Sequence, residues 1–192
     1  MTEYSARTRR WTRAEYEHLI EIGIFRPGEP VELMDGDLVV SEPQGTAHCT
    51  AIGLVEDALR AALPAGWFVR SQGPLALDDD SEPEPDVALI PGARRAYAQQ
   101  HPARPALVIE VSESSLALDR DYKGSLYARA HLDDYWIVNL IDRVLEVCRE
   151  PVPDAAASFG WRYRSVRALG RETSVAPLAS PDTPVRVVDL LP

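Results

Sequence analysis

Two acidic residues beside buried-strand patterns are the first candidates for chemistry. Glu110 lies within LVIEVS, residues 107–112, a run typical of a strand that is buried on both faces. A carboxylate in such a strand is costly unless it is paired, neutralised or bound to a metal ion. Asp86 follows Pro85 and directly precedes a second buried pattern, VALI. Acids from two neighbouring strands can converge on one hard cation such as Mg2+, which prefers carboxylate and water oxygens.

Each of these acids also has an ordinary structural explanation. Glu110 is compatible with a salt bridge to an arginine or with a polar strand end, because structural ion pairs also place acids in protein cores. Asp86 is compatible with a simple Pro-Asp turn at the start of a strand. The combination is more informative than either residue, because an acid pair held by two strands has the rigidity that a catalytic site requires.

Lys123 is the third candidate, and it is the only lysine among the 20 Lys and Arg residues of the chain. It lies on a predicted helix, thirteen residues after Glu110. A helix that crosses back over a sheet can return its first turns toward the C-terminal end of the preceding strand. An ammonium group there can stabilise a pentavalent phosphate or help to deprotonate an attacking water. The alternative is a lysine that is solvated on the helix surface.

Glu32 and His48 are weaker candidates. Glu32 sits between Val31 and Leu33 in the first strand of a predicted hairpin, where it is either a further acid of the site or an outward-facing strand residue. His48 lies near the start of a predicted helix and on its apolar face. Its position is compatible with a hydrogen-bonded core histidine or with a residue that lines the site.

Periodicity and turn signals place these residues on intermingled helices and strands. Thr12 and Glu15 have the spacing of a capping box at the start of a helix. Asp35-Gly36 is a two-residue turn signal within a hairpin over residues 31–40. We predict an α/β (α+β mixed) fold with a mixed sheet. The predicted helices are 12–22, 46–63 and about 119–131, and the other predicted strands are 67–71, 74–77, 86–90, 106–112, 135–140, 144–149 and 160–168.

Length and composition indicate a soluble globular protein. The chain has 192 residues, 45% hydrophobic and 26% charged, which suits one domain over 1–192, with a core of about 11–149 and appended strands in 160–192. No stretch approaches the roughly eighteen apolar residues that cross a bilayer. The N-terminus has no apolar run typical of a signal peptide, so we expect a cytoplasmic protein with no membrane partner. Cys49 and Cys148 lack zinc-site spacing and are expected to be two buried free thiols.

The net charge of -10 weighs against a protein that coats nucleic acid, because affinity for phosphates comes largely from clustered Lys and Arg. It does not exclude an enzyme that holds its substrate through bound metal ions, since a metal site itself requires several carboxylates.

Four segments of the sequence together resemble a known family. EPDVALIP (84–91), LVIEVSESS (107–115) and DRDYKGSLYARAHLDDYWIVNL (119–140) are similar to the Uma-two family of restriction-endonuclease-like proteins, in the PD-(D/E)XK nuclease superfamily. VELMDGDLVVSEPQGTAHCTAIGLVEDAL (31–59) resembles the N-terminal half of that family. The resemblance extends from about Trp11 to Pro192, and the order and spacing of the segments make it specific.

This resemblance implies a restriction endonuclease-like core, with a mixed sheet of four or five strands flanked by helices. It implies Mg2+, for which Mn2+ substitutes, bound by Asp86 and Glu110, with Glu32 as a further acid. One position departs from the superfamily pattern, because the lysine usually found two residues after the second acid is replaced by Ser112. The family pattern moves the lysine to the next helix, where Lys123 fits, and Ser112 becomes a candidate site-lining residue.

Three functions follow from these residues. The first is hydrolysis of DNA phosphodiester bonds by a magnesium-dependent endonuclease that uses Asp86, Glu110 and Lys123. The second is a catalytically inactive nuclease fold that acts in protein or nucleic-acid binding, which the acidity of the chain favours. The third is hydrolysis of RNA or of a small phosphodiester. The edge-like segments 144–149 and 160–168 are also compatible with a homodimer.

Overall fold

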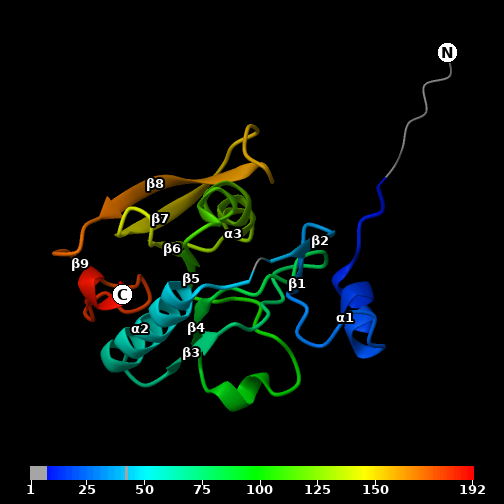
Figure 1. The fold of residues 1–192 in the computed structure, drawn as a ribbon, viewed down its shortest axis with the longest axis horizontal. Helices are drawn as coiled ribbons and strands as arrows, with labels where there is room; N and C mark the ends of the chain where they lie inside the picture. Colours follow the sequence, from blue (N-terminus) through cyan, green and yellow to red (C-terminus); the bar gives the residue numbers. More distant parts are fainter. Residues whose placement is uncertain (1–7, 42) are drawn as a thin grey trace.

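The computed structural model describes residues 8–41 and 43–192. Helices and strands are intermingled along the chain, as the sequence predicts for a mixed α/β fold (Figure 1). In chain order the elements are α1 (Arg13–Glu21), β1 (Val31–Met34), β2 (Asp37–Val40), α2 (Thr46–Ala62), β3 (Trp67–Ser71), β4 (Val87–Pro91), η1 (Arg94–Tyr97), β5 (Leu107–Ser112), η2 (Leu118–Lys123), α3 (Gly124–Arg129), β6 (Asp134–Asn139), β7 (Val144–Pro153), β8 (Trp161–Leu169), β9 (Ser174–Val175), β10 (Val185–Arg186) and η3 (Val187–Leu190).

A six-stranded mixed sheet in the order β3-β4-β5-β6-β7-β8 forms the centre of the molecule. β5 and β6 are parallel, and the other neighbouring strands are antiparallel. The sheet therefore has more strands than the four or five that the family resemblance implies. The strand predicted over 160–168 is β8 at one edge, and its partner β7 extends to Pro153.

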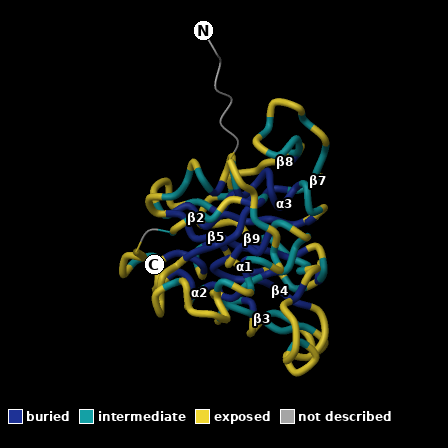
Figure 2. The backbone as a smooth tube through the Cα atoms, turned by 90° about the vertical axis from the view of Figure 1, so that its right-hand side faces the viewer, coloured by how far each residue is buried: buried dark blue, intermediate teal, exposed yellow. Residues whose placement is uncertain are grey.

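Side chains that alternate along β5 separate two hydrophobic layers. Leu107, Ile109 and Val111 pack in one cluster with α2 and η3. Val108 points to the other face, where it packs in a cluster with residues of α3. Because side chains alternate along a strand, Glu110 points to the α3 side together with Val108. Figure 2 shows the buried backbone concentrated in the interior around β5, with exposed segments in the outer loops.

Two local structures that the sequence predicts near the N-terminal end of the chain, a capping box and a tight turn, are present. Thr12 caps α1, and the side chain of Glu15 accepts a hydrogen bond from the Thr12 amide at 3.0 Å, which completes the capping box. Asp35 (φ 50°) and Gly36 (φ 79°) both have positive φ, as the tight turn between β1 and β2 requires. This hairpin and α1 lie together at the end of the molecule away from the C-terminus (Figure 1).

Two of the predicted elements were wrong in detail. Residues 74–77 do not form a strand, because the amides of Leu75 and Leu77 bond to the carbonyls of Pro83 and Ser81 in the same loop. The single helix predicted over about 119–131 is a π-helix, η2, followed by α3.

The prediction for the cysteines was half wrong. Cys148 is buried, but Cys49 is exposed because the first turn of α2 lies outside the buried face of that helix, which begins at Ala51. Within the part of the chain that the structure describes, no helix combines the length and apolar character needed to cross a membrane.

Candidate active site

A cavity of about 630 Å³ opens where the start of β4 lies beside the end of β5. We call it the acid cavity, because four buried carboxylates and one buried ammonium group line it. The buried charged members are Glu32, Asp86, Glu110, Asp119 and Lys123, and the exposed carboxylates of Glu84 and Glu113 also line the cavity. Asp86 directly precedes β4 and Glu110 lies near the end of β5, and the two strands run antiparallel, so the sheet itself places both acids at the same edge.

Backbone hydrogen bonds fix Asp86 and Glu110 side by side. Asp86 Oδ2 accepts a hydrogen bond from the amide of Val111 at 2.8 Å. The amide of Asp86 in turn donates to Glu110 Oε2 at 3.3 Å. The structure therefore brings together the two acids that the sequence singles out, and it orients both through main-chain contacts.

Lys123 lies between two of the acids. Its Nζ is 3.1 Å from Glu110 Oε1 and 3.4 Å from Glu32 Oε2. The Tyr127 hydroxyl also donates to Glu110 Oε1 at 2.8 Å. The ammonium of Lys123 is thus buried against carboxylates, and the alternative of a solvated helix lysine is wrong.

The charges of the acid cavity are unbalanced. Burial raises the pKa of Glu110 to about 8, and the nearby carboxylates of Asp86 and Asp119 add to the rise that Lys123 opposes. Burial alone would lower the pKa of Lys123, but the surrounding carboxylates outweigh it and raise the pKa well above its ordinary value. The surrounding carboxylates therefore favour the charged form of Lys123, which suits a role in charge stabilisation better than a role as a base.

Glu32 faces inward from β1, so the alternative of an outward-facing acid is wrong. Its side chain is buried, Oε1 accepts from the Ser41 hydroxyl at 2.6 Å, and Oε2 accepts from the Glu84 amide at 2.9 Å. Together with Lys123, these contacts connect the β1–β2 hairpin to the central sheet.

His48 contacts Asp86 from the first turns of α2. Its Nε2 lies 3.0 Å from Asp86 Oδ1, and Gln44 Nε2 lies 3.3 Å from the same oxygen. The side chain is partly buried and lines the acid cavity. The structure therefore places His48 at the wall of the site and not in the hydrophobic core.

Asp119 lines the acid cavity, whereas Ser112, which was predicted to line it, is buried in β5 and is not one of its lining residues. Ser112 is fully buried, and its hydroxyl has no hydrogen-bond partner among the described residues. The sequence analysis missed Asp119, which is buried in η2 and accepts a hydrogen bond from Ser115 at 2.6 Å. Burial raises the pKa of Asp119, although Lys123 opposes that rise. The available signal was the spacing of Asp119 and Lys123, four residues apart on one predicted helix.

The donor set of the acid cavity fits a hard divalent cation. Among the described residues, Glu110 Oε2 accepts a single long contact, from the Asp86 amide, and Asp86 Oδ1 faces the cavity residues His48 and Gln44. Within residues 8–41 and 43–192, no group of three or more His, Cys, Asp or Glu side chains is arranged to hold a metal ion. Magnesium is commonly bound through one or two carboxylates, with water and substrate phosphates completing the shell, so two carboxylates suffice for this ion.

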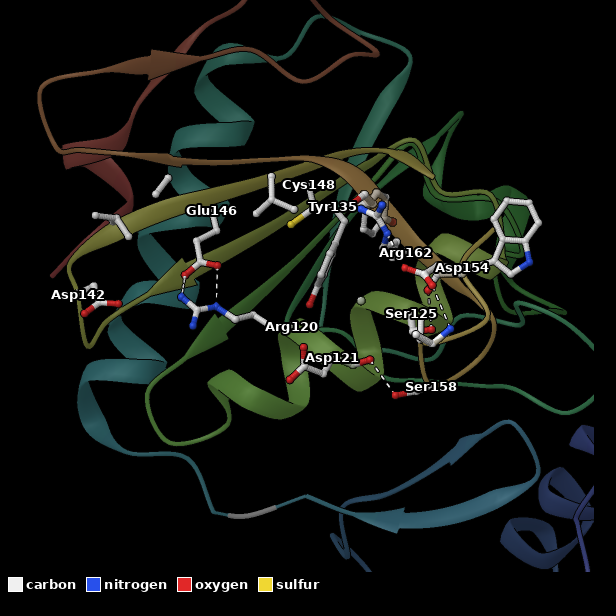
Figure 3. A pocket seen from close by; sticks show the side chains of 18 residues that line it. Arg120, Asp121, Ser125, Tyr135, Asp142, Glu146, Cys148, Asp154, Ser158 and Arg162 are labelled. Carbon is white, nitrogen blue, oxygen red and sulfur yellow. Dashed lines mark hydrogen bonds and ion pairs between the residues drawn. The ribbon is translucent and has the colours of Figure 1, made fainter. Parts of the chain in front are cut away.

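A second cavity, of about 870 Å³, lies on the other side of η2. We call it the outer cavity; it is bounded by η2, α3, β7 and β8 (Figure 3). Both of its arginines are paired with carboxylates. Arg120 binds Glu146 through contacts of 2.9 and 2.5 Å, and Arg162 binds Asp154 at 2.6 Å.

Comparisons with known proteins identify the fold and the family of the chain. None of the curated proteins compared matches the chain. A crystal structure described as "a putative nuclease" from Anabaena variabilis superposes with a TM-score of 0.65 and 14% sequence identity, covering 90% of this chain and 96% of the other. At that identity the likeness establishes a shared fold. The profile of the Uma2 family, described as "Putative restriction endonuclease", matches residues 13–182, and the chain belongs to this family.

Proposed function

We propose that this protein is a metal-dependent endonuclease that hydrolyses DNA phosphodiester bonds in the acid cavity. One observation carries the proposal: Asp86 and Glu110, from adjacent strands, are joined by a 3.3 Å contact, and Glu110 lies 3.1 Å from the only lysine of the chain. Membership of a family of restriction-endonuclease-like proteins supports the reaction class.

Asp86 and Glu110 would hold Mg2+, or Mn2+ in its place. The bound ion would polarise the phosphate and lower the pKa of a coordinated water. Glu32 is proposed as a further acid that acts through Lys123, because both of its oxygens lie within 3.5 Å of the lysine Nζ.

Lys123 would supply the fixed positive charge of the site. Its ammonium is held between Glu110 and Glu32, so it is positioned before the substrate arrives and does not reorganise during the reaction. Negative charge that develops on the phosphate oxygens is stabilised by this cation. His48 keeps Asp86 oriented through its contact with Oδ1.

Nicking of supercoiled plasmid tests the proposal. Wild-type protein is compared with Asp86→Ala and Lys123→Ala, in Mg2+ and in EDTA. We expect cleavage that requires the divalent ion and falls about 100-fold or more in both variants. Asp57→Ala, at an exposed position of α2, is the matched control and should cleave as the wild type does. Equal cleavage by all four proteins would indicate a contaminating nuclease and end the proposal.

The alternative is an inactive nuclease fold that binds protein or nucleic acid. It is favoured by the internal pairing of Lys123 with Glu32 and Glu110, which neutralises part of the site without any ion. Calorimetric titration with Mn2+ separates the two functions. The nuclease should bind Mn2+ in a manner that depends on Glu110, and the inactive module should not. The proposed homodimer is tested separately, by the molar mass in light scattering.

A further inference from the structure

Some arginines lack an acidic partner, although acids outnumber bases in the chain. Within the part of the chain that the structure describes, nine arginines are ion-paired with a carboxylate. Among those that form no such pair are Arg70 on β3 and Arg94 and Arg95 on η1, in the connection from β4 to β5. We call these three residues the arginine track.

Arg70 is the most constrained member of the arginine track. Its Nε is buried and has no hydrogen-bond partner among the described residues, and its Nη2 donates to Nδ1 of His101 at 3.1 Å. A Cβ atom at Gly73 would lie 2.5 Å from Arg70 Nε, so a glycine is needed there to leave room for the guanidinium. Burial, with the charge of Arg94, lowers the pKa of Arg70. A partly buried cation without a carboxylate is costly unless a ligand supplies the opposite charge.

Arg70 lies on the same face of the sheet as the acids of the acid cavity. It is opposite Ala88 in the β3–β4 register, and Ala88 packs in the cluster on the α3 side, where Glu110 also points. The amide of Gln72, two residues further along the chain, donates to the Asp86 carbonyl at 3.0 Å. Two strand residues and one strand spacing therefore separate the Cα atoms of Arg70 and Asp86 by roughly 8 Å. A strand of nucleic acid bound in the acid cavity lies within reach of the Arg70 side chain.

The two arginines of η1 extend the positive charge beyond Arg70. Arg94 Nη2 donates to the Val69 carbonyl at 3.1 Å, and its guanidinium lies over the Phe68 ring, 5.5 Å from the centroid, so Arg94 is held beside β3. Arg95 is the next residue and is exposed. Residues 87–109 contain no Asp or Glu, so the connection between the two candidate metal-binding strands carries basic side chains and no acid.

The acids near the arginine track do not cancel its charge. Glu56 is near Arg94 but is paired with Arg60 at 2.9 Å. Glu84 is exposed, and burial raises the pKa of Glu82 to about 7, so that its carboxyl is partly protonated at neutral pH. The planar guanidinium group can bind two oxygens of a phosphate at once. Three such groups on neighbouring elements fit a chain of phosphates better than they fit a single small anion.

We propose that Arg70, Arg94 and Arg95 bind backbone phosphates of the DNA strand that is cut in the acid cavity, with Arg70 nearest to the candidate metal-binding acids. The inference rests on the proposed function insofar as DNA is the ligand. Phosphate contacts fix the register of a nucleic acid but carry no sequence information directly, so the arginine track contributes affinity and orientation. Each phosphate that it neutralises releases counterions, which makes the affinity depend on salt.

The salt dependence of DNA binding tests this assignment. Binding of a labelled duplex is followed by fluorescence anisotropy in EDTA, over a tenfold range of KCl concentration. The test variant combines Arg70→Gln, Arg94→Gln and Arg95→Gln. We expect the slope of log K against log salt to become shallower by roughly 2.7, which is about 0.9 for each lost phosphate contact. The affinity at the lowest salt should fall about tenfold or more.

The matched control combines Arg167→Gln, Arg171→Gln and Arg186→Gln, which also removes three exposed arginines, from β8, the loop after it and β10. It should keep the wild-type slope. If the test variant does not fold, Arg95→Gln alone replaces it and should make the slope shallower by about 0.9. No binding by the wild type, an unchanged slope in the folded variant, or an equal loss in the control would overturn the assignment.

This assay contains no metal and measures no cleavage, so it separates the two proposals. A protein that loses slope in the test variant but does not cut plasmid would refute the nuclease alone. A protein that cuts plasmid but keeps its slope in the test variant would refute the arginine track alone.

Discussion

The acid cavity and the outer cavity lie on either side of η2, and they differ in how their buried acids are paired with basic groups. The six residues of η2 place Asp119 and Lys123 in the first cavity and Arg120 and Asp121 in the second. In the outer cavity each of the two arginines is matched to a carboxylate of its own. In the acid cavity four buried carboxylates share a single ammonium group.

Two glutamates illustrate the consequence. Burial opposes ionisation of both Glu110 and Glu146. At Glu146 the hydrogen bonds from Arg120 and Asn139 outweigh burial, and the pKa is lowered. At Glu110 the single lysine does not compensate for burial and for three other acids, and the pKa rises to about 8. Glu146, on one side of η2, is thus paired with basic and amide donors, whereas Glu110, on the other side, lacks enough positive charge to offset its burial. Buried acids with raised pKa values of this kind are typical of ligand sites.

The largest expected effect comes from removing the lone cation of the acid cavity. Lys123→Met keeps the length and apolar stem of the side chain but removes the charge that Glu110 and Glu32 share. Plasmid cleavage should fall about 100-fold or more, because the stabilising charge is lost in the transition state. Single-turnover cleavage rates at saturating Mg2+ measure this. Retention of more than a tenth of the wild-type rate would contradict a role for Lys123 in the reaction.

The next effect is a dependence of stability on pH that arises at Glu110. The folded-state pKa of about 8 lies above the ordinary value of 4.5, so the folded protein binds the proton more tightly than the unfolded chain does. The free energy of unfolding should therefore decrease as the pH rises from about 5 to 8. Glu110→Gln resembles the protonated acid and should remove this decrease, worth roughly 2–4 kcal/mol across that window.

Thermal unfolding in EDTA at pH 5 and pH 8 measures the difference between Glu110→Gln and the wild type. The variant should gain stability relative to the wild type as the pH rises. A difference that stays constant with pH would show that Glu110 is fully compensated, and the contrast with Glu146 would then be lost.

Much of the fold was accessible from the sequence because local signals were strong. The strand around Glu110 is an unbroken apolar run, and Asp35-Gly36 has the chemistry of its turn. The convergence of Asp86, Glu110 and Lys123 also follows from strand order and a returning helix. These features depend on short stretches of sequence or on general rules of chain connection.

Other features depend on tertiary contacts that the sequence alone does not specify. The burial of Asp119 requires the π-helical turn of η2, which periodicity cannot distinguish from an α-helix. The contact of His48 with Asp86 depends on how α2 packs, because an apolar stripe fits a core histidine equally well. The local bonding of residues 74–77 to the loop at 81–83 is likewise a tertiary outcome.

A smaller effect is expected in the outer cavity. Arg120→Ala leaves the buried carboxylate of Glu146 with the Asn139 amide as its remaining donor, at 2.7 Å. The loss should lower the free energy of unfolding by about 1–3 kcal/mol, because a charged hydrogen bond is removed from a buried acceptor. Urea unfolding at pH 7 measures this, and plasmid cleavage by the folded variant should match the wild type. A large fall in cleavage would mean that η2 transmits changes between the cavities.

The smallest effect is expected at the rim of the outer cavity. Arg162 contacts Asp154 at 2.6 Å, but more than half of the arginine side chain is exposed, so water competes with the pair. Arg162→Ala should leave the melting temperature and the cleavage rate within experimental error of the wild type. The two arginine variants can then be compared within one cavity, because both arginines pair with an acid and the acid is more buried at Arg120 than at Arg162. A measurable loss at Arg162 as large as that at Arg120 would show that burial is not what sets the strength of these pairs.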